Sequence, residues 1–277
     1  MKKINILLLS LFLATAIYAN DKLKLVILHT NNTHSQVEPT DVSALRTSNM
    51  GGYARRMGVI DSIRKAEKHV LLFDAGDYWQ GTPYFNFYNG RVEIDAMNRM
   101  KYDAATLGNH EFDNGLDTMV AVLRKAQFPI VVSNYNSPNT QLNEIIRPYI
   151  ITERGGMKIG VFGLGVQPQG LILDTNYKGL NYEDAVKIGR ETSNYLRTTK
   201  KCDLVICLSH NGYETDIDIA RNSTNIDIII GGHSHTLLEN KTTPNANHQP
   251  VVIAQMGKSG LFMGKIDLEF ELKKIRK

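Results

Sequence analysis

The sequence contains few cysteines, little proline and no large excess of charge of one sign. Two cysteines among 277 residues exclude a disulfide framework, and eight prolines exclude a proline-rich disordered chain. Cys202 and Cys207 lie in one predicted strand, where they would be about 16 Å apart, too far to form a disulfide with each other. A formal net charge of +4 without a clustered basic face predicts no nucleic-acid partner.

A long apolar run is also missing after the first residues. Two lysines precede an apolar run at residues 4–16, and the small residue Ala19 follows, which is the pattern of a signal peptide. The run is too short to span a membrane comfortably, and no later stretch approaches 18 apolar residues. We therefore expect a signal peptide at residues 1–19, with Ala16 as an alternative cleavage site. We expect residues 20–277 to form one domain of a secreted or periplasmic protein with no membrane span.

Apolar runs alternate with helical patterns in the first half of the chain. Short apolar runs indicate strands at residues 24–29, 70–73, 104–107 and 129–133. Helical spacing of apolar residues indicates helices at residues 52–68, 92–100 and 116–126. The second half predicts a hairpin at 149–163, helices at 182–199 and 216–221, strands at 203–209 and 227–230, and antiparallel strands at 251–255 and 261–272. This order predicts an α/β domain whose mixed sheets are covered by helices.

Five of the eight histidines lie in the loops just after predicted strands: His34, His110, His210, His233 and His235. Asp77 and Asn109 hold matching positions. Taken singly, a histidine at a strand end is more often an ordinary polar residue. Together these side chains favour a metal site, because the carboxyl ends of strands converge at one edge and these residue types bind first-row divalent ions. They are too many for one tetrahedral zinc, which favours two metals that share a carboxylate.

Several short blocks carry a resemblance to a known family: Leu28–His34, Gly51–Arg55, Asp74–Asp77, Gly108–Asp113, Gly232–His235 and Gln255–Lys258. In this order they resemble the catalytic domain of the bacterial 5′-nucleotidases, within the calcineurin-like metallophosphoesterases. The resemblance implies a four-layer α/β/β/α sandwich of two mixed β-sheets. It also implies a hydrolase of nucleotide catabolism that cleaves phosphomonoesters, above all 5′-nucleotides, by attack of a hydroxide that bridges two divalent metals.

The resemblance further implies a role for each site residue. Asp77 would bridge the two metals. One metal would also bind Asn109, His210 and His233, and the other would bind Asn32, His34 and His235. His110 would contact the substrate phosphate beside Asn109, and Asp113 would orient His110. Zinc, manganese, iron and cobalt all suit these ligands.

The chain departs from the family pattern at two points. The family usually has aspartate where this chain has Asn32, so we hypothesise that the metal there binds more weakly or that the enzyme is slow. The secreted nucleotidases usually carry a C-terminal domain that binds the nucleoside, whereas this sequence ends at Lys277. One alternative is therefore a non-catalytic or impaired metal-binding subunit that a separate partner chain completes. The other is a related phosphodiesterase or sulfate thiohydrolase.

Other residues near the predicted site have a structural as well as a functional interpretation. Asp113 could cap the following helix, and Glu111 and Asp74 are expected to be structural. The segment 78–84, which holds the only tryptophan, could line the mouth of a cleft or simply pack onto the domain. The basic residues at 273–277 are expected to be a solvated end.

Overall fold

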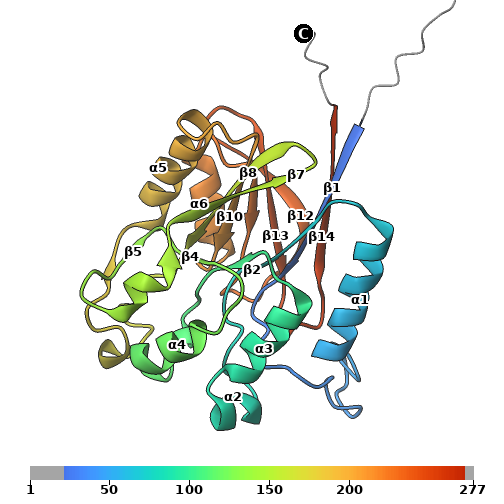
Figure 1. Cartoon of the computed structure of the whole chain (residues 1–277), viewed down its shortest axis with the longest axis vertical. Coiled ribbons are helices and arrows are strands. Elements are labelled where there is room, and N and C mark those ends of the chain that lie inside the picture. The colour runs from blue at the N-terminus through green and yellow to red at the C-terminus, as the bar shows by residue number, and fades with distance from the viewer. Residues whose placement is uncertain (1–21, 272–277) are drawn as a thin grey trace, which may run out of the picture.

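A computed structural model describes residues 22–271, and their strands form two six-stranded sheets (Figure 1). The first sheet has the order β14-β1-β2-β3-β4-β6. Its strands are β1 (Lys22–Thr30), β2 (Val70–Asp74), β3 (Ala104–Ala105), β4 (Ile130–Val131), β6 (Ile146–Arg147) and β14 (Gly264–Glu271). All its neighbours are parallel except β14, which runs antiparallel to β1.

The second sheet has the order β12-β13-β11-β10-β8-β7. Its strands are β7 (Tyr149–Arg154), β8 (Met157–Leu164), β10 (Leu204–Ser209), β11 (Ile228–Ile230), β12 (Leu237–Pro244) and β13 (Pro250–Met256). The two edge pairs, β7 with β8 and β12 with β13, are antiparallel, and the pairs between them are parallel. A small separate sheet pairs β5 (Tyr135–Asn136) with β9 (Asn181–Tyr182).

Helices cover the outer faces of the two large sheets. The first sheet carries α1 (Tyr53–Ala66), α3 (Arg91–Met100) and α4 (Gly115–Leu123), with the short α2 (Pro83–Tyr88) beside them. The second carries α5 (Ala185–Thr198) and α6 (Tyr213–Arg221). Short 3₁₀ helices lie at η1 (His110–Phe112), η2 (Gln141–Glu144) and η3 (Asp174–Asn176). The order helix, sheet, sheet, helix confirms the predicted four-layer α/β/β/α sandwich.

Strand β1 illustrates why the central layers are so apolar. Leu25 and Ile27 belong to the apolar cluster between the two sheets, whereas Val26 and Leu28 belong to the cluster beneath α1, α3 and α4. Because successive side chains of a strand point to opposite faces, a strand buried on both faces needs an apolar residue at each of these positions. The continuous apolar runs in the sequence therefore mark the central strands of each sheet, which are buried on both faces.

Several elements and one pairing differ from the sequence prediction. The sequence pattern does not predict α2, β12 or the two-residue strands β5, β6 and β9. Most side chains of β12 are exposed, so its sequence lacks a clear alternation. The two C-terminal strands exist, but they lie in different sheets. β13 pairs with β12 and β11, whereas β14 returns to β1 and aligns Leu268 with Leu25. The predicted hairpin is confirmed as β7 and β8.

The only tryptophan is part of the core. Tyr78 and Trp79 are each 1% exposed, and the Trp79 ring stacks on Phe85 with 6.1 Å between centroids. These two residues therefore pack inside the domain, and the idea that they line the mouth of a cleft is wrong. Cys202 and Cys207 are buried and free, as expected.

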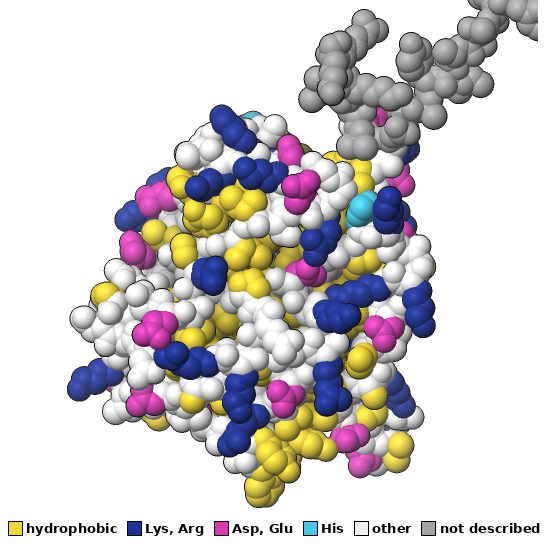
Figure 2. Space-filling model, viewed as in Figure 1, with side chains coloured by type: hydrophobic (Ala, Val, Ile, Leu, Met, Phe, Trp, Pro, Cys, Tyr) yellow, Lys and Arg dark blue, Asp and Glu magenta, His cyan; other side chains and the backbone are white. Residues whose placement is uncertain are grey.

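The surface and the chain ends complete the description. Basic and acidic side chains are interspersed on the face shown in Figure 2, with apolar side chains gathered at its lower tip over α2. No helix within residues 22–271 is both long and apolar enough to cross a membrane. The expected signal peptide and the basic residues at 273–277 lie outside the described residues.

Candidate metal centre

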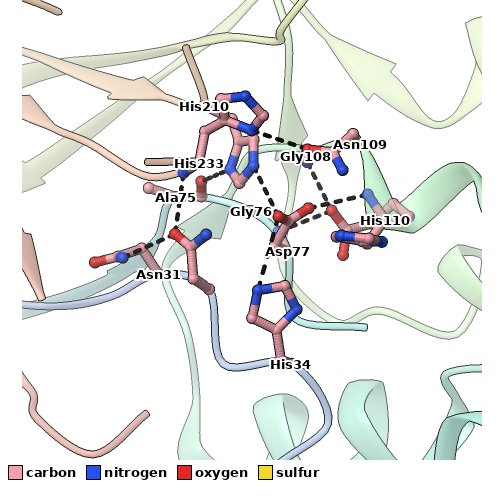
Figure 3. Close-up of polar contacts among 12 residues, drawn as sticks. Asn31, His34, Ala75, Gly76, Asp77, Gly108, Asn109, His110, His210 and His233 are labelled. Carbon is pink, nitrogen blue, oxygen red and sulfur yellow. Dashed lines mark hydrogen bonds and ion pairs between the residues drawn. The ribbon is translucent and has the colours of Figure 1, made fainter. Parts of the chain in front are cut away.

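The sequence-predicted site residues converge where the carboxyl ends of strands from both sheets meet (Figure 3). The loops after β1, β2 and β3 supply one half, and those after β10 and β11 supply the other. The residues brought together are Asn32, His34, Asp77, Asn109, His110, His210, His233 and His235. About two hundred residues of sequence separate some of these neighbours, such as His34 and His235, whose Nε2 atoms are 3.0 Å apart.

Asp77 belongs to two groups of potential ligands. Its carboxylate and the imidazoles of His34 and His110 have ligand atoms that all lie within 4.8 Å of one another. The same carboxylate forms a second group with His210 and His233 within the same distance. A carboxylate shared in this way has the geometry of a bridging ligand between two neighbouring cations.

Backbone carbonyls fix the orientation of two of the imidazoles. Nδ1 of His34 lies 3.1 Å from the Gln80 carbonyl oxygen, and Nδ1 of His210 lies 2.6 Å from that of Ala75. When each Nδ1–H donates to its carbonyl, Nε2 presents a lone pair toward Asp77. His210 Nε2 is 3.0 Å and His34 Nε2 is 4.0 Å from Asp77 Oδ2. A lone pair facing a carboxylate needs a cation between them, so this donor set fits a divalent metal.

The electrostatics of the site agree with this interpretation. Burial lowers the pKa of His34 and of His233 to about 4, so both imidazoles are neutral and able to bind a metal at neutral pH. Burial also opposes charge on His210, but the charge and hydrogen bond of Asp77 outweigh it and raise the pKa of His210 to about 9. Without a metal, a proton therefore occupies the position between His210 and Asp77.

The backbone is strained at the same residues. Five of the predicted metal ligands have left-handed φ angles: Asn32 (48°), His34 (47°), Asp77 (56°), His233 (67°) and His235 (54°). Such a conformation costs a non-glycine residue about 1–3 kcal/mol, and it persists where the surroundings impose it. Glycine makes close approach possible nearby, since a Cβ on Gly108 would lie 2.2 Å from Asp77 Oδ1.

The amide oxygen of Asn32 is engaged in hydrogen bonds within the protein rather than free to bind a metal ion. Oδ1 accepts hydrogen bonds from the backbone N–H of His233 at 3.0 Å and from Asn31 Nδ2 at 2.9 Å. Nδ2 is buried and has no hydrogen-bond partner among the described residues. An amide nitrogen cannot bind a metal ion, so Asn32 offers less than an aspartate would at this position.

His110 and Asp113 form a hydrogen-bonded pair beside the two groups. His110 Nδ1 lies 2.8 Å from Asp113 Oδ2, and the His110 backbone N–H donates to Asp77 Oδ1 at 2.9 Å. Asp113 does not cap α4, whose N-cap is Asn114. Burial lowers the pKa of His110, but the Asp113 hydrogen bond and the Asp77 charge outweigh it and raise that pKa above its usual value.

Glu111 and Asp74 have structural roles, as expected. Glu111 accepts hydrogen bonds from three buried backbone N–H groups, those of Asp77, Gly108 and Trp79. Asp74 accepts from Thr30 Oγ1 and from the backbone N–H of Gly76. Both carboxyls thus hold the loop that carries Asp77.

Two further supporting residues were not predicted from the sequence. Gln255 Oε1 accepts hydrogen bonds from the Thr236 backbone N–H at 2.6 Å and from Ser234 Oγ at 3.2 Å, which holds the loop between β11 and β12. Asn31 bonds the Met256 N–H and the Gly257 carbonyl, which ties the first metal-site loop to the end of β13. A polar residue at the end of the apolar run of β13 was the available signal for Gln255.

Comparison with known proteins agrees with the fold and with this geometry. The chain matches the calcineurin-like phosphoesterase family over residues 25–237. It is 37% identical over 241 residues to the snake venom 5′-nucleotidase of Crotalus adamanteus, an alignment that covers 84% of this chain and 41% of the relative.

Solved structures give the same assignment. The 5′-nucleotidase precursor of Thermus thermophilus has a TM-score of 0.83 and 30% identity, covering 88% of this chain and 51% of that one. The calcineurin-like phosphoesterase YfkN of Bacillus subtilis has a TM-score of 0.73 and 28% identity, covering 92% and 87%. The chain thus spans about half or less of the length of the 5′-nucleotidases it matches. It belongs to the calcineurin-like phosphoesterase family, whose members use divalent metals, and it is a relative of the 5′-nucleotidases.

Proposed function

We propose that this chain is an exported phosphomonoesterase that binds two divalent metal ions and hydrolyses 5′-nucleotides. The observation that carries the proposal is the position of Asp77, whose carboxylate is shared by the His34 group and the His210–His233 group. One ion would be held by Asp77, Asn109, His210 and His233. The other would be held by Asp77, His34 and His235, with Asn32 as a weak or absent ligand.

Bound ions at this position would supply an activated water nucleophile and neutralise charge on the phosphoryl oxygens. The remaining chemistry belongs to the side chains of this chain. His110 is oriented by Asp113 through Nδ1, which leaves Nε2 for the substrate phosphate or the leaving oxygen. Its raised pKa favours the protonated imidazole, which stabilises negative charge and can donate a proton to the leaving group.

Nucleotides are the substrate class that the relatives favour, because the proteins of Crotalus adamanteus and Thermus thermophilus are both 5′-nucleotidases. A second candidate function is a metal-binding subunit that a separate chain completes. The orientation of Asn32 favours it, since the second ion would then be held with only one carboxylate nearby. The ordered His110–Asp113 pair argues for catalysis in this chain, because metal binding alone needs no such pair.

Phosphate release decides between these functions. The mature protein would be assayed with Mn²⁺ or Zn²⁺ on AMP, ATP, a cyclic nucleotide, a UDP-sugar and p-nitrophenyl phosphate. We expect release from AMP that is lost in His110→Ala and kept in His248→Asn, a control at an exposed position whose left-handed backbone suits asparagine. Turnover of no substrate by a protein that still binds metal would support the subunit instead.

Export rests on the sequence pattern of residues 1–19. N-terminal sequencing of the protein recovered from a bacterial periplasm or medium tests it. We expect a mature chain that begins at Asn20, or at Ile17 if the alternative site is used. An intact N-terminus in the cytoplasmic fraction would contradict export.

A further inference from the structure

The segment between β13 and β14 is bonded to two loops of the candidate metal centre. The Gly257 backbone N–H donates to the Thr236 carbonyl at 3.0 Å, and the Ser259 backbone N–H donates to the Asn32 carbonyl at 2.7 Å. Thr236 directly follows one proposed metal ligand, and Asn32 is the position of another. Gly257 and Ser259 have left-handed φ angles of 64° and 59°, as residues of tight turns often do. Lys258 lies between these two residues, so its backbone is held beside the centre.

The ammonium group of Lys258 is close to the imidazoles proposed for the second ion. Lys258 is exposed, and the ion pairs among residues 22–271 do not include it. Burial is the largest cause that lowers the pKa of His235, and the Lys258 charge comes next, ahead of the opposite effect of Asp77. Burial lowers the pKa of His34 to about 4, and the Lys258 charge acts in the same direction. The centre therefore has an accessible cation beside it that no acid of the described chain neutralises.

A lysine at this place is unfavourable for metal binding taken alone. Its charge repels a cation held by His34 and His235, and Asp77 is the one carboxylate in both groups of potential ligands. Two divalent cations and an ammonium group beside a single carboxylate leave a large excess of positive charge. An anion that contacts the ammonium group as well as the ions would neutralise part of that excess. For a phosphoesterase, the substrate phosphate is such an anion.

We propose that Lys258 binds the phosphoryl group of the substrate, on the side of the centre formed by His34 and His235. This assignment rests on the phosphomonoesterase function proposed above and adds a substrate-binding residue to it. An ammonium group is a compact charge with three rotatable donors on a flexible stem, so it can follow a phosphoryl oxygen. Every phosphomonoester carries this group. Lys258 should therefore strengthen the binding of each ester by a similar factor, whatever its leaving group.

Calorimetric titration of the Mn²⁺-loaded mature protein with inorganic phosphate tests the contact without turnover. We expect Lys258→Met to weaken phosphate binding at least about tenfold, because a hydrogen bond between charged groups contributes that much. Lys258→Arg keeps the charge and should retain most of the affinity. Lys187→Met removes an exposed lysine of α5 and is the matched control, which should bind phosphate as the wild type does. Unchanged phosphate affinity in Lys258→Met, or no phosphate binding by the metal-loaded wild type, would overturn the proposal.

Metal affinity should change in the opposite direction. Without the Lys258 charge, an ion held by His34 and His235 meets less repulsion. We therefore expect Lys258→Met to bind the weaker Mn²⁺ ion at least about threefold more tightly at low salt, and added salt should reduce this gain. A lysine that only supported the turn would weaken metal and phosphate binding together when it is replaced. An equal or lower Mn²⁺ affinity in Lys258→Met would thus contradict the position given to its charge.

Steady-state kinetics identifies which part of the substrate Lys258 contacts. We expect Lys258→Met to raise KM by the same factor for AMP and for p-nitrophenyl phosphate, with a smaller change in kcat. A rise in KM confined to ATP would assign Lys258 to the leaving group and would overturn the proposal. A wild-type protein that hydrolyses neither ester, yet binds phosphate more tightly than Lys258→Met does, would contradict the phosphatase function while supporting this binding residue.

Discussion

The amide oxygen of Asn32 accepts a hydrogen bond from the backbone N–H of His233 at 3.0 Å. This bond connects Asn32, at one proposed metal position, to the loop that carries His233, a proposed ligand of the other metal. The same bond fixes the orientation of the Asn32 amide, so its nitrogen takes the position in which an aspartate would have its second oxygen. This nitrogen is buried and has no hydrogen-bond partner among residues 22–271. Asp77 is then the one carboxylate in both ligand groups, which makes the two metal positions unequal.

Asn32→Asp should strengthen binding of the weaker ion. An aspartate can keep one oxygen on the His233 N–H and present the other, with its charge, to the metal. We expect at least about a tenfold gain in affinity for the second ion, measured by calorimetric titration with Mn²⁺, since ligand charge tunes affinity strongly. Asn143→Asp adds the same charge at an exposed position and should change neither site. An unchanged second affinity in Asn32→Asp would show that Asn32 does not limit binding.

His110→Ala should remove activity without removing metal. Loss of a positioned acid–base group lowers kcat by about 10²–10⁴-fold. Metal content should stay at the wild-type level, because the other proposed ligands are intact. Loss of bound metal together with activity would instead make His110 a ligand, as its place in the His34–Asp77 group allows.

Asp113→Asn should shift the pH profile of kcat/KM. The Asp113 hydrogen bond raises the pKa of His110, against the effect of burial. If His110 acts in its protonated form, removing that carboxylate lowers the pKa and moves the alkaline limb to lower pH. Asp117→Asn, an exposed acid on α4, is the control and should leave the limb in place. A lower rate with an unmoved limb in Asp113→Asn would indicate a merely structural role.

Glu111→Ala should destabilise the fold strongly. Glu111 is 1% exposed and accepts hydrogen bonds from three backbone N–H groups, which would lose their acceptor. We expect a loss of about 3–5 kcal/mol in the free energy of unfolding by urea. Glu144→Ala removes an exposed carboxylate paired with Arg124 and should cost less than about 1 kcal/mol. Equal effects of the two variants would contradict the role given to Glu111.

Asp216→Asn should stabilise the protein at pH 8 and have little effect at pH 4. Burial raises the pKa of Asp216 to about 8, so the folded state holds a proton that the unfolded carboxyl loses near its ordinary pKa of 3.8. The stability that depends on this proton is complete below the unfolded pKa and is lost as the pH rises through about 8. Thermal unfolding of both proteins from pH 4 to pH 9 measures it. Parallel curves for the two proteins would refute the shift.

Local signals in the sequence predicted mixed sheets covered by helices and the group of five histidines, Asp77 and Asn109 after strands, whereas the four-layer order and the roles of Asn32 and Asp113 were implied by the resemblance to the family. Continuous apolar runs mark buried strands, and His34, His210 and His233 each follow one. Long-range pairing leaves no such signal, so the return of β14 to β1 was not predicted. The orientation of Asn32 likewise depends on His233, far away in sequence. Burial of Trp79 depends on Phe85 and the surrounding core rather than on its polar neighbours.

The metal content of the mature protein tests the account most directly. Metal-free protein would be titrated with Mn²⁺ beside Asp77→Asn and the His248→Asn control. The account predicts two ions per chain in the wild type and the control, one bound at least about tenfold more tightly, and a loss of both high- and low-affinity binding in Asp77→Asn. A single ion in the wild type, or two ions retained in Asp77→Asn, would contradict a centre built on a shared Asp77 carboxylate.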